Sequence, residues 1–507
     1  MSTKLSSNSR RSAAVGTVAV AVAFGVAELL AGALSIGGSV VAAVGNLIID
    51  LAPESLVRFG IRVFGFYDKP VLLGGIVVVG LLIGAVLGRL AGRSFGLAAF
   101  GFAAAGALGS YAVWQDPLTS TAAGMATVWG GVLAGVGALR YLTGRVEVVE
   151  QDAGRRQFIF ALGGVAAFAV LAAATGRVLV GRMREVIAGR EDVVLPHPID
   201  TQALPLAGDA LSVEGLSDLV TPNEDFYRID TAVSVPRVDL DTWTLKIGGM
   251  VDRPIELTFD DLLDLPMVER FVTLSCVSNR VGGNLVGHAR WQGIPLRDLL
   301  DRVGVQEGAT QIVGRSVDDF TVGFPTEAVF DGREALVAVA MNGEPLPFDH
   351  GFPARLVVGG LYGYVSATKW LSEIELTTWE AFDAYWIPRG WSKEAPIKTQ
   401  SRIDVPRQGE NPEAGRVPVA GVAWAPNRGV SKVEVQIDDG PWVEAELSAE
   451  LSRDSWRQWA LDWDAEPGEH SIQVRATDGH GDTQTSEVAA PAPNGATGYH
   501  ARQVTVT

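Results

Sequence analysis

The stretch of sequence that decides the fold reads Met341-Asn-Gly-Glu-Pro-Leu-Pro-Phe-Asp-His350-Gly-Phe-Pro-Ala-Arg355-Leu-Val-Val, with Lys369-Trp-Leu shortly after it. A strand expected at Arg355–Val358 has an imidazole before it and an ammonium group after it. Arginine offers a planar fork of donors and lysine a point charge, so the two suit a bound phosphate. A single histidine is more often a structural residue, and the interpretation therefore rests on the whole run.

The single cysteine, Cys276, ends a second apolar strand expected at Phe271–Cys276. One cysteine excludes an intrachain disulfide and any metal site built from cysteines alone. A lone cysteine at the end of a strand is usually a small core residue. Beside Arg280 and a metal ion, however, its thiol would be deprotonated and would become a soft ligand. The cysteine alone leaves both interpretations open.

Short strands and helices alternate irregularly around these two stretches. We expect strands at Trp243–Ile247, Phe271–Cys276, Leu336–Ala340 and Arg355–Val358, and helices at Phe259–Leu265 and Leu296–Val303. This mixture indicates an α+β domain rather than a regular βαβ array.

A different pattern begins near Pro412. Alternating strands are expected at Val417–Trp424, Val430–Ile437, Trp456–Trp463 and His470–Thr477. Strands at this spacing favour a β-sandwich. We expect its core to be built by the tryptophans of this region, namely Trp424, Trp442, Trp456, Trp459 and Trp463.

The first part of the chain is far more apolar. Over all 507 residues the mean hydropathy is +0.21, and 48% of the residues are hydrophobic. Five stretches approach the roughly 20 residues that a helix needs to cross a bilayer. They are about Ala13–Leu34, Val71–Leu90, Phe95–Trp114, Thr121–Leu142 and Phe158–Val180. We predict an α-helical transmembrane bundle of about five spans, with Ile36–Leu51 as an interfacial or re-entrant segment; a soluble helical bundle is the alternative.

Basic residues in the short loops set the expected orientation. Three groups agree: Lys4, Arg10 and Arg11 before the first span, Arg89 and Arg93 between spans two and three, and Arg140, Arg145, Arg155 and Arg156 between spans four and five. The loop with Arg58, Arg62 and Lys69 indicates the opposite side. Five spans then place the N-terminus in the cytoplasm and everything after about residue 182 outside, whereas a sixth span would reverse this. The pair Arg155-Arg156 resembles a twin-arginine export signal, and ordinary positive-inside flanking is its alternative.

Charge is divided unevenly between the two parts. Residues 1–190 carry 16 Lys and Arg against 9 Asp and Glu, whereas the rest carries 25 against 49. An acidic second part repels phosphate backbones, so we expect no nucleic-acid partner. None of the six histidines precedes residue 190, and no Cys-x-x-Cys-His motif is present. The composition therefore predicts no haem in the chain itself.

These motifs resemble the sulfite oxidase family of molybdopterin-dependent oxidoreductases. The run from Met341 to Leu371 is long and specific, and Leu274-Ser-Cys-Val-Ser-Asn-Arg280 with Ala289-Arg-Trp-Gln-Gly293 resembles the family's cysteine motif. Thr221-Pro-Asn-Glu-Asp-Phe-Tyr-Arg228 is also similar. The resemblance covers about half of the chain. With its apolar first part, the chain resembles a membrane-anchored, polytopic, actinobacterial-type branch.

Together with the patterns above, the resemblance divides the chain into four parts. These are a transmembrane domain at 1–182, a linker at 183–222, an α+β molybdopterin-binding domain at 223–411 and an immunoglobulin-like, dimerisation-type β-sandwich at 412–507. The implied cofactor is Mo-molybdopterin. Its dithiolene supplies two sulfur ligands to molybdenum, and one protein thiolate would complete the set.

The resemblance also implies which residues form the site. Cys276 would be the thiolate ligand of molybdenum. The residues expected to hold the pterin and its phosphate are Asp318, His350, Arg355, Ser366 and Lys369, and those expected to line the cofactor are Phe226, Tyr227 and Arg228. Arg280 and Trp391 are expected to act on the substrate beside Cys276.

Two departures from the family weaken the expectation of sulfite oxidation. Where sulfite-oxidising relatives carry two consecutive arginines, this chain has Arg280-Val281, and their active-site tyrosine aligns with Trp391. One fewer cation and a bulky indole should weaken the binding of sulfite. His288 and Arg389 could supply protons or charge nearby, or could be ordinary surface residues.

Three functions compete. The first is an extracytoplasmic enzyme that transfers an oxygen atom to or from a sulfoxide- or sulfite-like molecule, with electrons exchanged with a quinone or a redox protein. The second is a non-catalytic, membrane-anchored binding protein that keeps the fold. The third is a transporter with an external sensing domain, for which Glu28 is the main candidate unless its side chain reaches the membrane surface. Cys276 and the basic residues favour the enzyme; membrane lipid and a homodimer are further expected partners.

Overall fold

The computed structural model describes residues 2–34, 38–146, 152–206 and 208–507. The chain forms two compact units. One comprises Met1–Ala188 and Ala232–Arg237, and the other comprises Gly189–Thr231 and Val238–Thr507.

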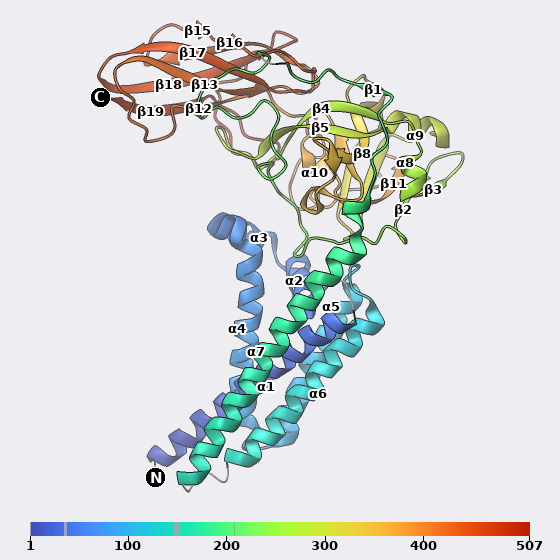
Figure 1. The fold of residues 1–507 in the computed structure, drawn as a ribbon, viewed down its shortest axis with the longest axis vertical. Helices are drawn as coiled ribbons and strands as arrows, with labels where there is room; N and C mark the ends of the chain where they lie inside the picture. The colour runs from blue at the N-terminus through green and yellow to red at the C-terminus, as the bar shows by residue number, and fades with distance from the viewer. Residues whose placement is uncertain (1, 35–37, 147–151, 207) are drawn as a thin grey trace. The chain divides into compact units, whose positions relative to one another are not determined.

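The first unit is helical (Figure 1). Its elements are α1 (Ser2–Ala33), α2 (Val40–Leu51), α3 (Glu54–Phe64), the 3-10 turn η1 (Gly65–Tyr67), α4 (Asp68–Ala91), α5 (Phe95–Gln115), α6 (Thr121–Val146) and α7 (Asp152–Ala188). Within the described ranges, α1, α4, α5, α6 and α7 contain helices long and apolar enough to cross a membrane. These five helices coincide with the five stretches expected from composition. Ile36, where the expected interfacial segment begins, lies outside the described residues.

Helix α1 contacts α4, α6 and α7, and small residues allow the backbones to approach closely. A Cβ built on Gly16 would lie 1.9 Å from the carbonyl oxygen of Gly84, so a larger residue at 16 would push the two helices apart. Glu28 on α1 is buried, and the hydroxyl of Ser39 donates to its carboxylate. The carboxylate is therefore held inside the helical unit and does not reach out of it.

The second unit begins with a mixed α/β part. Its elements are η2 (Arg190–Asp192), β1 (Asp200–Thr201), β2 (Thr244–Gly249), β3 (Ile255–Thr258), α8 (Phe259–Leu263), β4 (Val268–Ser275), β5 (Val286–Pro295), α9 (Leu296–Val303), β6 (Gln311–Ser316), β7 (Thr321–Pro325), η3 (Thr326–Val329), β8 (Ala335–Met341), β9 (Glu344–Pro345), η4 (Phe348–His350), β10 (Arg355–Val358), α10 (Gly363–Ser366) and β11 (Leu371–Thr377). One sheet has the order β1-β4-β5-β8-β10, with β9 paired to β8, and the other has the order β3-β2-β11-β6-β7.

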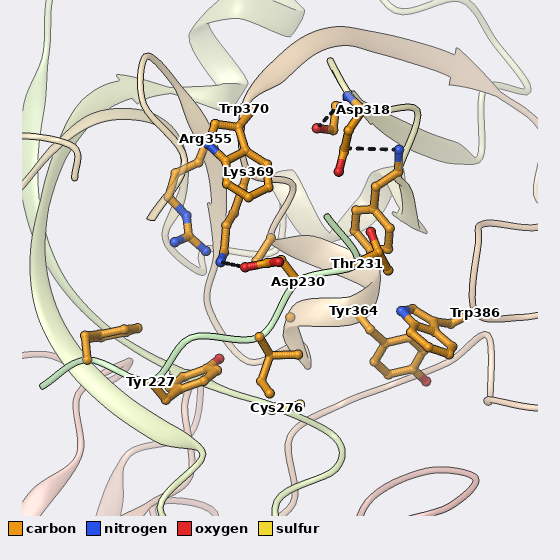
Figure 2. A pocket seen from close by; sticks show the side chains of 16 residues that line it. Tyr227, Asp230, Thr231, Cys276, Asp318, Arg355, Tyr364, Lys369, Trp370 and Trp386 are labelled. Carbon is orange, nitrogen blue, oxygen red and sulfur yellow. Dashed lines mark hydrogen bonds and ion pairs between the residues drawn. The ribbon is translucent and has the colours of Figure 1, made fainter. Parts of the chain in front are cut away.

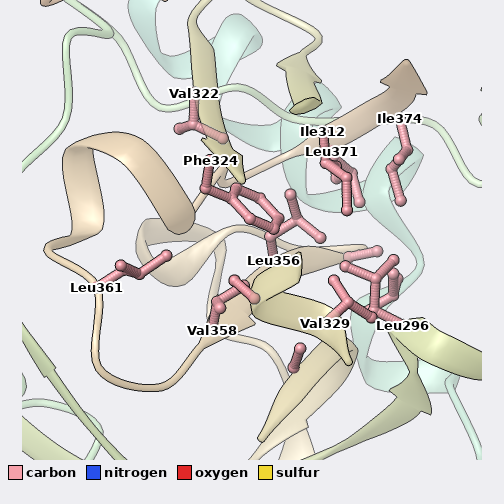
Figure 3. Close-up of a cluster of buried hydrophobic side chains, with 14 of the residues drawn as sticks. Leu296, Ile312, Val322, Phe324, Val329, Leu356, Val358, Leu361, Leu371 and Ile374 are labelled. Atoms are coloured by element: carbon pink, nitrogen blue, oxygen red, sulfur yellow. The ribbon is translucent and has the colours of Figure 1, made fainter. Parts of the chain in front are cut away.

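A large apolar core fills the mixed part, and Figure 3 shows a portion of it. The side chains of β8 point alternately into two cores. Val337 belongs to this core, whereas Leu336 and Ala338 belong to a second cluster with Trp291. Strand β10 divides in the same way, because Leu356 joins the first core and Val357 the second. Both faces of this sheet are therefore covered, which explains the unbroken apolar runs in its strands.

The chain ends in two antiparallel sheets of four strands. The strands are β12 (Gln400–Val405), β13 (Gly415–Trp424), β14 (Val430–Ile437), β15 (Val443–Glu444), β16 (Glu446–Leu447), β17 (Arg457–Ala465), β18 (Gly468–Asp478) and β19 (His500–Val506). Their orders are β12-β13-β17-β16 and β15-β14-β18-β19. A separate apolar cluster lies between them, with Val419 from one sheet and Val435 from the other.

Three details of the domain plan differ from our expectations. Much of the expected linker is folded, since β1 adds to the first sheet beside β4 and Arg190 donates to the carbonyl of Leu346. The two-sheet part begins with β12 at Gln400, ahead of the expected boundary at 412. Trp424 and Trp456 belong to the core of the mixed part instead of the sandwich core, where Trp459 is the buried indole.

Candidate functional site

Cys276 directly follows β4 and begins a tight loop. Its backbone N–H donates to the carbonyl of Leu285, and the side chain of Asn279 accepts a hydrogen bond from the N–H of Leu285. These bonds close the loop on itself, so the thiol is held at the end of a buried strand. Burial raises the pKa of the Cys276 thiol, and hydrogen bonds from Ser278 partly offset this.

Two buried cations share a cavity with the thiol. Arg355, the first residue of β10, donates to the carbonyl of His350 at 3.0 Å and lies over the Trp291 ring at 4.9 Å. Lys369 pairs with Asp230 at 3.2 Å and donates to the carbonyl of Asp349. Burial lowers the pKa of Arg355 to about 10, and burial lowers that of Lys369 to about 8 although Asp230 favours its charge.

Aromatic residues line the same cavity from the segment before β2. Phe226 packs edge-on against Trp291 at 5.7 Å and against His350 at 5.5 Å, and it stacks on Tyr227 at 5.3 Å. Arg228 turns away and pairs with Asp230 and Asp349. The rings therefore form one wall that joins the cysteine loop to the basic residues.

A partly open cavity lies between the cysteine loop, the aromatic wall and the two cations (Figure 2). The predicted residues that line it are Phe226, Tyr227, Cys276, Asp318, Arg355 and Lys369. A second hollow shares Phe226 and is lined by Arg228 and His350. The structure thus brings eight of the eleven predicted residues to two adjoining hollows.

Three predicted residues line neither hollow. Ser366 is fully buried, and its hydroxyl donates to the carbonyls of Leu361 and Tyr362. Arg280 is exposed in the cysteine loop. Trp391 contacts the ring of Tyr364 at 5.8 Å, and therefore lies behind a residue that does line the cavity.

Two tryptophans line the cavity, Trp370 and Trp386, and the second of them lies five residues before Trp391. Sequence reasoning also missed Asp230, Thr231 and Tyr364. Asp230 and Thr231 follow the predicted Phe226-Tyr-Arg run after one intervening residue, Ile229, so extending that run would have found them. Nothing periodic in the segment around Trp386 indicates which of its aromatic residues faces inward.

His288 and Arg389, named above as accessory candidates, have other contacts. His288 is completely buried, and its ring nitrogens face the carbonyl of Leu219 at 2.6 Å and the hydroxyl of Ser455 at 3.0 Å. Burial lowers its pKa to about 4. Arg389 donates to the carbonyl of Tyr385 and lies 3.7 Å over its ring. The expectation that His288 could be a surface residue is therefore wrong, and neither side chain lines the two hollows.

The residues of the two hollows fit a large anionic ligand with ring nitrogens. Arg355 is 3% exposed, and its hydrogen-bond acceptors are backbone carbonyls, so an anion would offset the cost of its burial. His350 Nε2 must donate to the carbonyl of Asn223, since a carbonyl can only accept. Its Nδ1 is then a buried acceptor without a partner among the described residues. A phosphate and a heterocyclic N–H donor would satisfy these groups.

Comparison with known proteins also indicates a cofactor-binding domain. Residues 232–386 match the family model described as the oxidoreductase molybdopterin binding domain. Human mitochondrial sulfite oxidase is 31% identical over 319 residues, covering 53% of this chain and 58% of that protein. Sulfite oxidase of Arabidopsis thaliana is 29% identical over 339 residues, covering 55% and 82%.

A solved structure shares the fold. The sulfane dehydrogenase SoxCD from Paracoccus pantotrophus aligns with a TM-score of 0.51 at 23% identity, covering 58% of this chain and 84% of that one. The chain spans about three fifths of the length of the mammalian sulfite oxidases that it matches. The chain therefore carries an oxidoreductase molybdopterin-binding domain at residues 232–386, and this part of the chain is similar to sulfite oxidases.

Proposed function

We propose that the chain is a membrane-anchored oxidoreductase that transfers an oxygen atom to or from a small oxo-compound outside the cytoplasm. The observation that carries the proposal is one cavity lined by Cys276 together with two buried cations, Arg355 and Lys369. A molybdenum cofactor would supply a centre that accepts or releases an oxygen atom and passes electrons on. The protein would hold that cofactor and shape the space for substrate.

Each residue has a proposed part in holding the cofactor. Cys276 would be the thiolate ligand of the metal, and a bound cation would favour its deprotonated form. Arg355 and Lys369 would hold the phosphate, and His350 Nδ1 would accept a hydrogen bond from the pterin. Asp318 is held in place by its turn, because it accepts from the N–H of Phe320. Phe226, Tyr227 and Arg228 would line the cofactor.

The other three predicted residues have different proposed parts. Ser366 would stabilise α10, which precedes the lysine, through its hydroxyl. Trp391 would position Tyr364 and would not touch the substrate itself. Arg280, being exposed, would act at most on molecules that approach the site.

Membrane attachment is proposed from the five apolar helices and from α3. Leu56, Phe59 and Val63 on α3 are all more than half exposed and lie on one helical face, as in a helix at a membrane surface. We propose that residues 1–182 form the membrane domain and that the cofactor domain is extracytoplasmic. The twin-arginine reading stays a proposal, and the side chain of Arg155 lies outside the described residues.

An enzyme fusion tests the orientation. Alkaline phosphatase, which is active only outside the cytoplasm, should be active when fused after residue 190 and inactive when fused after residue 93. The opposite pattern would reverse the proposed orientation.

The C-terminal strands are proposed to be the immunoglobulin-like unit that mediates dimerisation in relatives, and a homodimer is proposed with it. The electron partner is proposed to be separate from the chain, either a quinone or a redox protein. Membrane lipid would be a further partner.

Metal analysis tests the enzyme. Full-length protein purified from a host that makes the cofactor should contain about one molybdenum per chain. Cys276→Ser should lose it, whereas the control Ser372→Ala, on β11 outside both hollows, should keep it. Wild-type protein without molybdenum would reject the enzyme in favour of a non-catalytic binding protein that keeps the fold.

A further inference from the structure

The wall of the cavity continues along the chain into the helical unit. Asp230 and Thr231 line the cavity, and the next residue, Ala232, begins a stretch that belongs to the helical unit (Figure 2). This stretch, Ala232–Arg237 (the strap), ends where the chain returns to the second unit at Val238. One peptide bond therefore separates a residue of the cavity from a segment that packs with the helices.

A lysine of α4 holds the start of the strap. The ammonium group of Lys69, in the first turn of α4, donates to the carbonyl of Ala232 at 2.6 Å. The strap forms neither helix nor strand, and Ala232 is only 5% exposed. A buried carbonyl outside regular structure needs a donor from another part of the chain. Lys69 therefore supplies a hydrogen bond that local secondary structure does not.

An apolar contact holds the next residue of the strap. A Cβ built on Gly45 of α2 would lie 3.7 Å from a methyl group of Val233 and 3.3 Å from a methyl group of Leu73 on α4. Val233 thus packs on Gly45 where α2 contacts α4. A hydrogen bond to one helix and an apolar contact with another fix the strap on the helical unit.

On the cavity side, the carboxylate of Asp230 joins two cations. It is 5% exposed and pairs with Lys369 at 3.2 Å and with Arg228 at 3.0 Å, and Figure 2 shows the pair with Lys369. Residues 227–238 form neither helix nor strand, so no ladder of backbone hydrogen bonds fixes Asp230. Its position therefore depends on these side-chain contacts and on the strap, which begins two residues later.

We propose that Lys69 is a positioning residue that acts through the carbonyl of Ala232: by fixing the strap, it keeps Asp230 where its carboxylate holds Lys369. The helical unit then helps to build the cofactor cavity, in addition to its proposed attachment to a membrane. The link to the cofactor rests on the proposed function, in which Lys369 binds the phosphate. The contacts of the strap do not depend on that assignment.

Hydrogen exchange, measured by mass spectrometry on full-length protein from a host that cannot make the pterin, tests the anchoring. Amides exchange faster where packing and hydrogen bonds are lost. Lys69→Met should accelerate exchange in the peptide covering residues 227–238 about tenfold, the effect of losing one hydrogen bond to a charged group. Val233→Ser, which removes the apolar contact, should also accelerate it. The matched control is Arg145→Met, because Arg145 also donates to a backbone carbonyl of the helical unit, that of Tyr141.

Acetylation of Lys369 by acetic anhydride, in the same protein, tests whether the strap acts on the cavity. The Lys369 side chain is 10% exposed and should react slowly, whereas Lys246 is 62% exposed and serves as the internal reference. A displaced Asp230 would free the ammonium group and expose it. The two strap variants should therefore raise the ratio of the two rates about threefold, and the control should not.

Faster exchange confined to residues 227–238, together with faster acetylation of Lys369, would support the inference. Unchanged exchange in this peptide, faster exchange over the whole chain in both strap variants, or an unchanged acetylation ratio would overturn it.

Molybdenum content after expression in a competent host tests the link to the cofactor. It should fall several-fold in Lys69→Met, but less than about twofold further when Lys69→Met is added to Lys369→Met, since both changes act on the same ammonium group. Independent losses that multiply would overturn the positioning role. Wild type without molybdenum would reject the proposed function, while exchange and acetylation would still decide whether Lys69 positions Asp230.

Discussion

Replacing Lys369 with methionine should separate the stability of the protein from its capacity to hold the cofactor. The ammonium group is buried, and burial lowers its pKa from 10.5 to about 8. A shift of this size corresponds to about 3 kcal/mol by which the folded, cofactor-free protein disfavours the charged lysine. Methionine removes that penalty and keeps most of the volume.

The lowered pKa of Lys369 already includes its attraction to Asp230, so the loss of this ion pair is not a separate cost. Asp230 loses a partner at 3.2 Å but keeps Arg228 at 3.0 Å, so its carboxylate is still paired. The melting temperature of cofactor-free Lys369→Met should therefore be no lower than that of wild type at pH 7.

The pH dependence of the difference in stability between wild type and Lys369→Met is the more decisive measurement. Because the pKa of Lys369 is lower in the folded protein than in the unfolded chain, its buried charge destabilises the folded state fully below about pH 8. Between pH 8 and 10.5 the unfolded chain holds more protons, so the folded state gains stability as pH rises. Across this pH window the free energy of unfolding of wild type should therefore rise relative to that of Lys369→Met by up to about 3 kcal/mol.

The assay is thermal unfolding of full-length protein from a host that cannot make the pterin, at pH 7 to 10. The control is Lys246→Met, whose ammonium group is mostly exposed. Molybdenum content after expression in a competent host should fall at least tenfold in Lys369→Met and not in the control. A wild-type-to-variant difference that is flat or declines with pH, together with normal molybdenum content, would refute the reasoning.

Two further predictions concern the surroundings of the site. Gly282 has a φ of +74°, and a Cβ there would lie 2.3 Å from the His500 ring, so Gly282→Ala should lower both the melting temperature and the molybdenum content. The control is Gly332→Ala, at a position with a φ of +93° but with open space around it. This control should lower the melting temperature less and leave the molybdenum content unchanged. The pKa of His288 is lowered to about 4, so the folded state should lose stability as pH falls from 6.5 toward 4; thermal unfolding of His288→Gln over this range should show a shallower loss than wild type, and an equal slope would contradict it.

Local structure could be predicted where periodicity is strong. The helix expected at Leu296–Val303 is α9 with the same bounds, because its apolar residues repeat on one face. The strand expected at Val430–Ile437 is likewise β14 with the same bounds. Both elements bury one face against a core, and that burial is what produces the sequence pattern.

The sequence did not allow us to predict which core or cavity each tryptophan contacts. Alternation indicates that Trp424, at the end of β13, and Trp456, directly before β17, point inward, but it does not say which neighbour they meet. Trp386 and Trp391 lie in an irregular turn, where no repeat fixes which side chain faces the cavity. Contacts between distant segments decide both cases, and these depend on the assembled fold.

The placement of those tryptophans suggests why a sandwich follows the cofactor domain. Trp456 donates its indole N–H to the carbonyl of Leu219, so the two parts share a core. From the sandwich, Arg402 donates to the carbonyl of Gly283 in the cysteine loop, and its charge is balanced by Asp404 at 2.6 Å. A thiolate ligand must be held to within a fraction of an ångström. A loop of ten residues gains that rigidity from a partner with its own core, and the sandwich contacts the cysteine loop at the residues that follow Cys276, the proposed thiolate ligand.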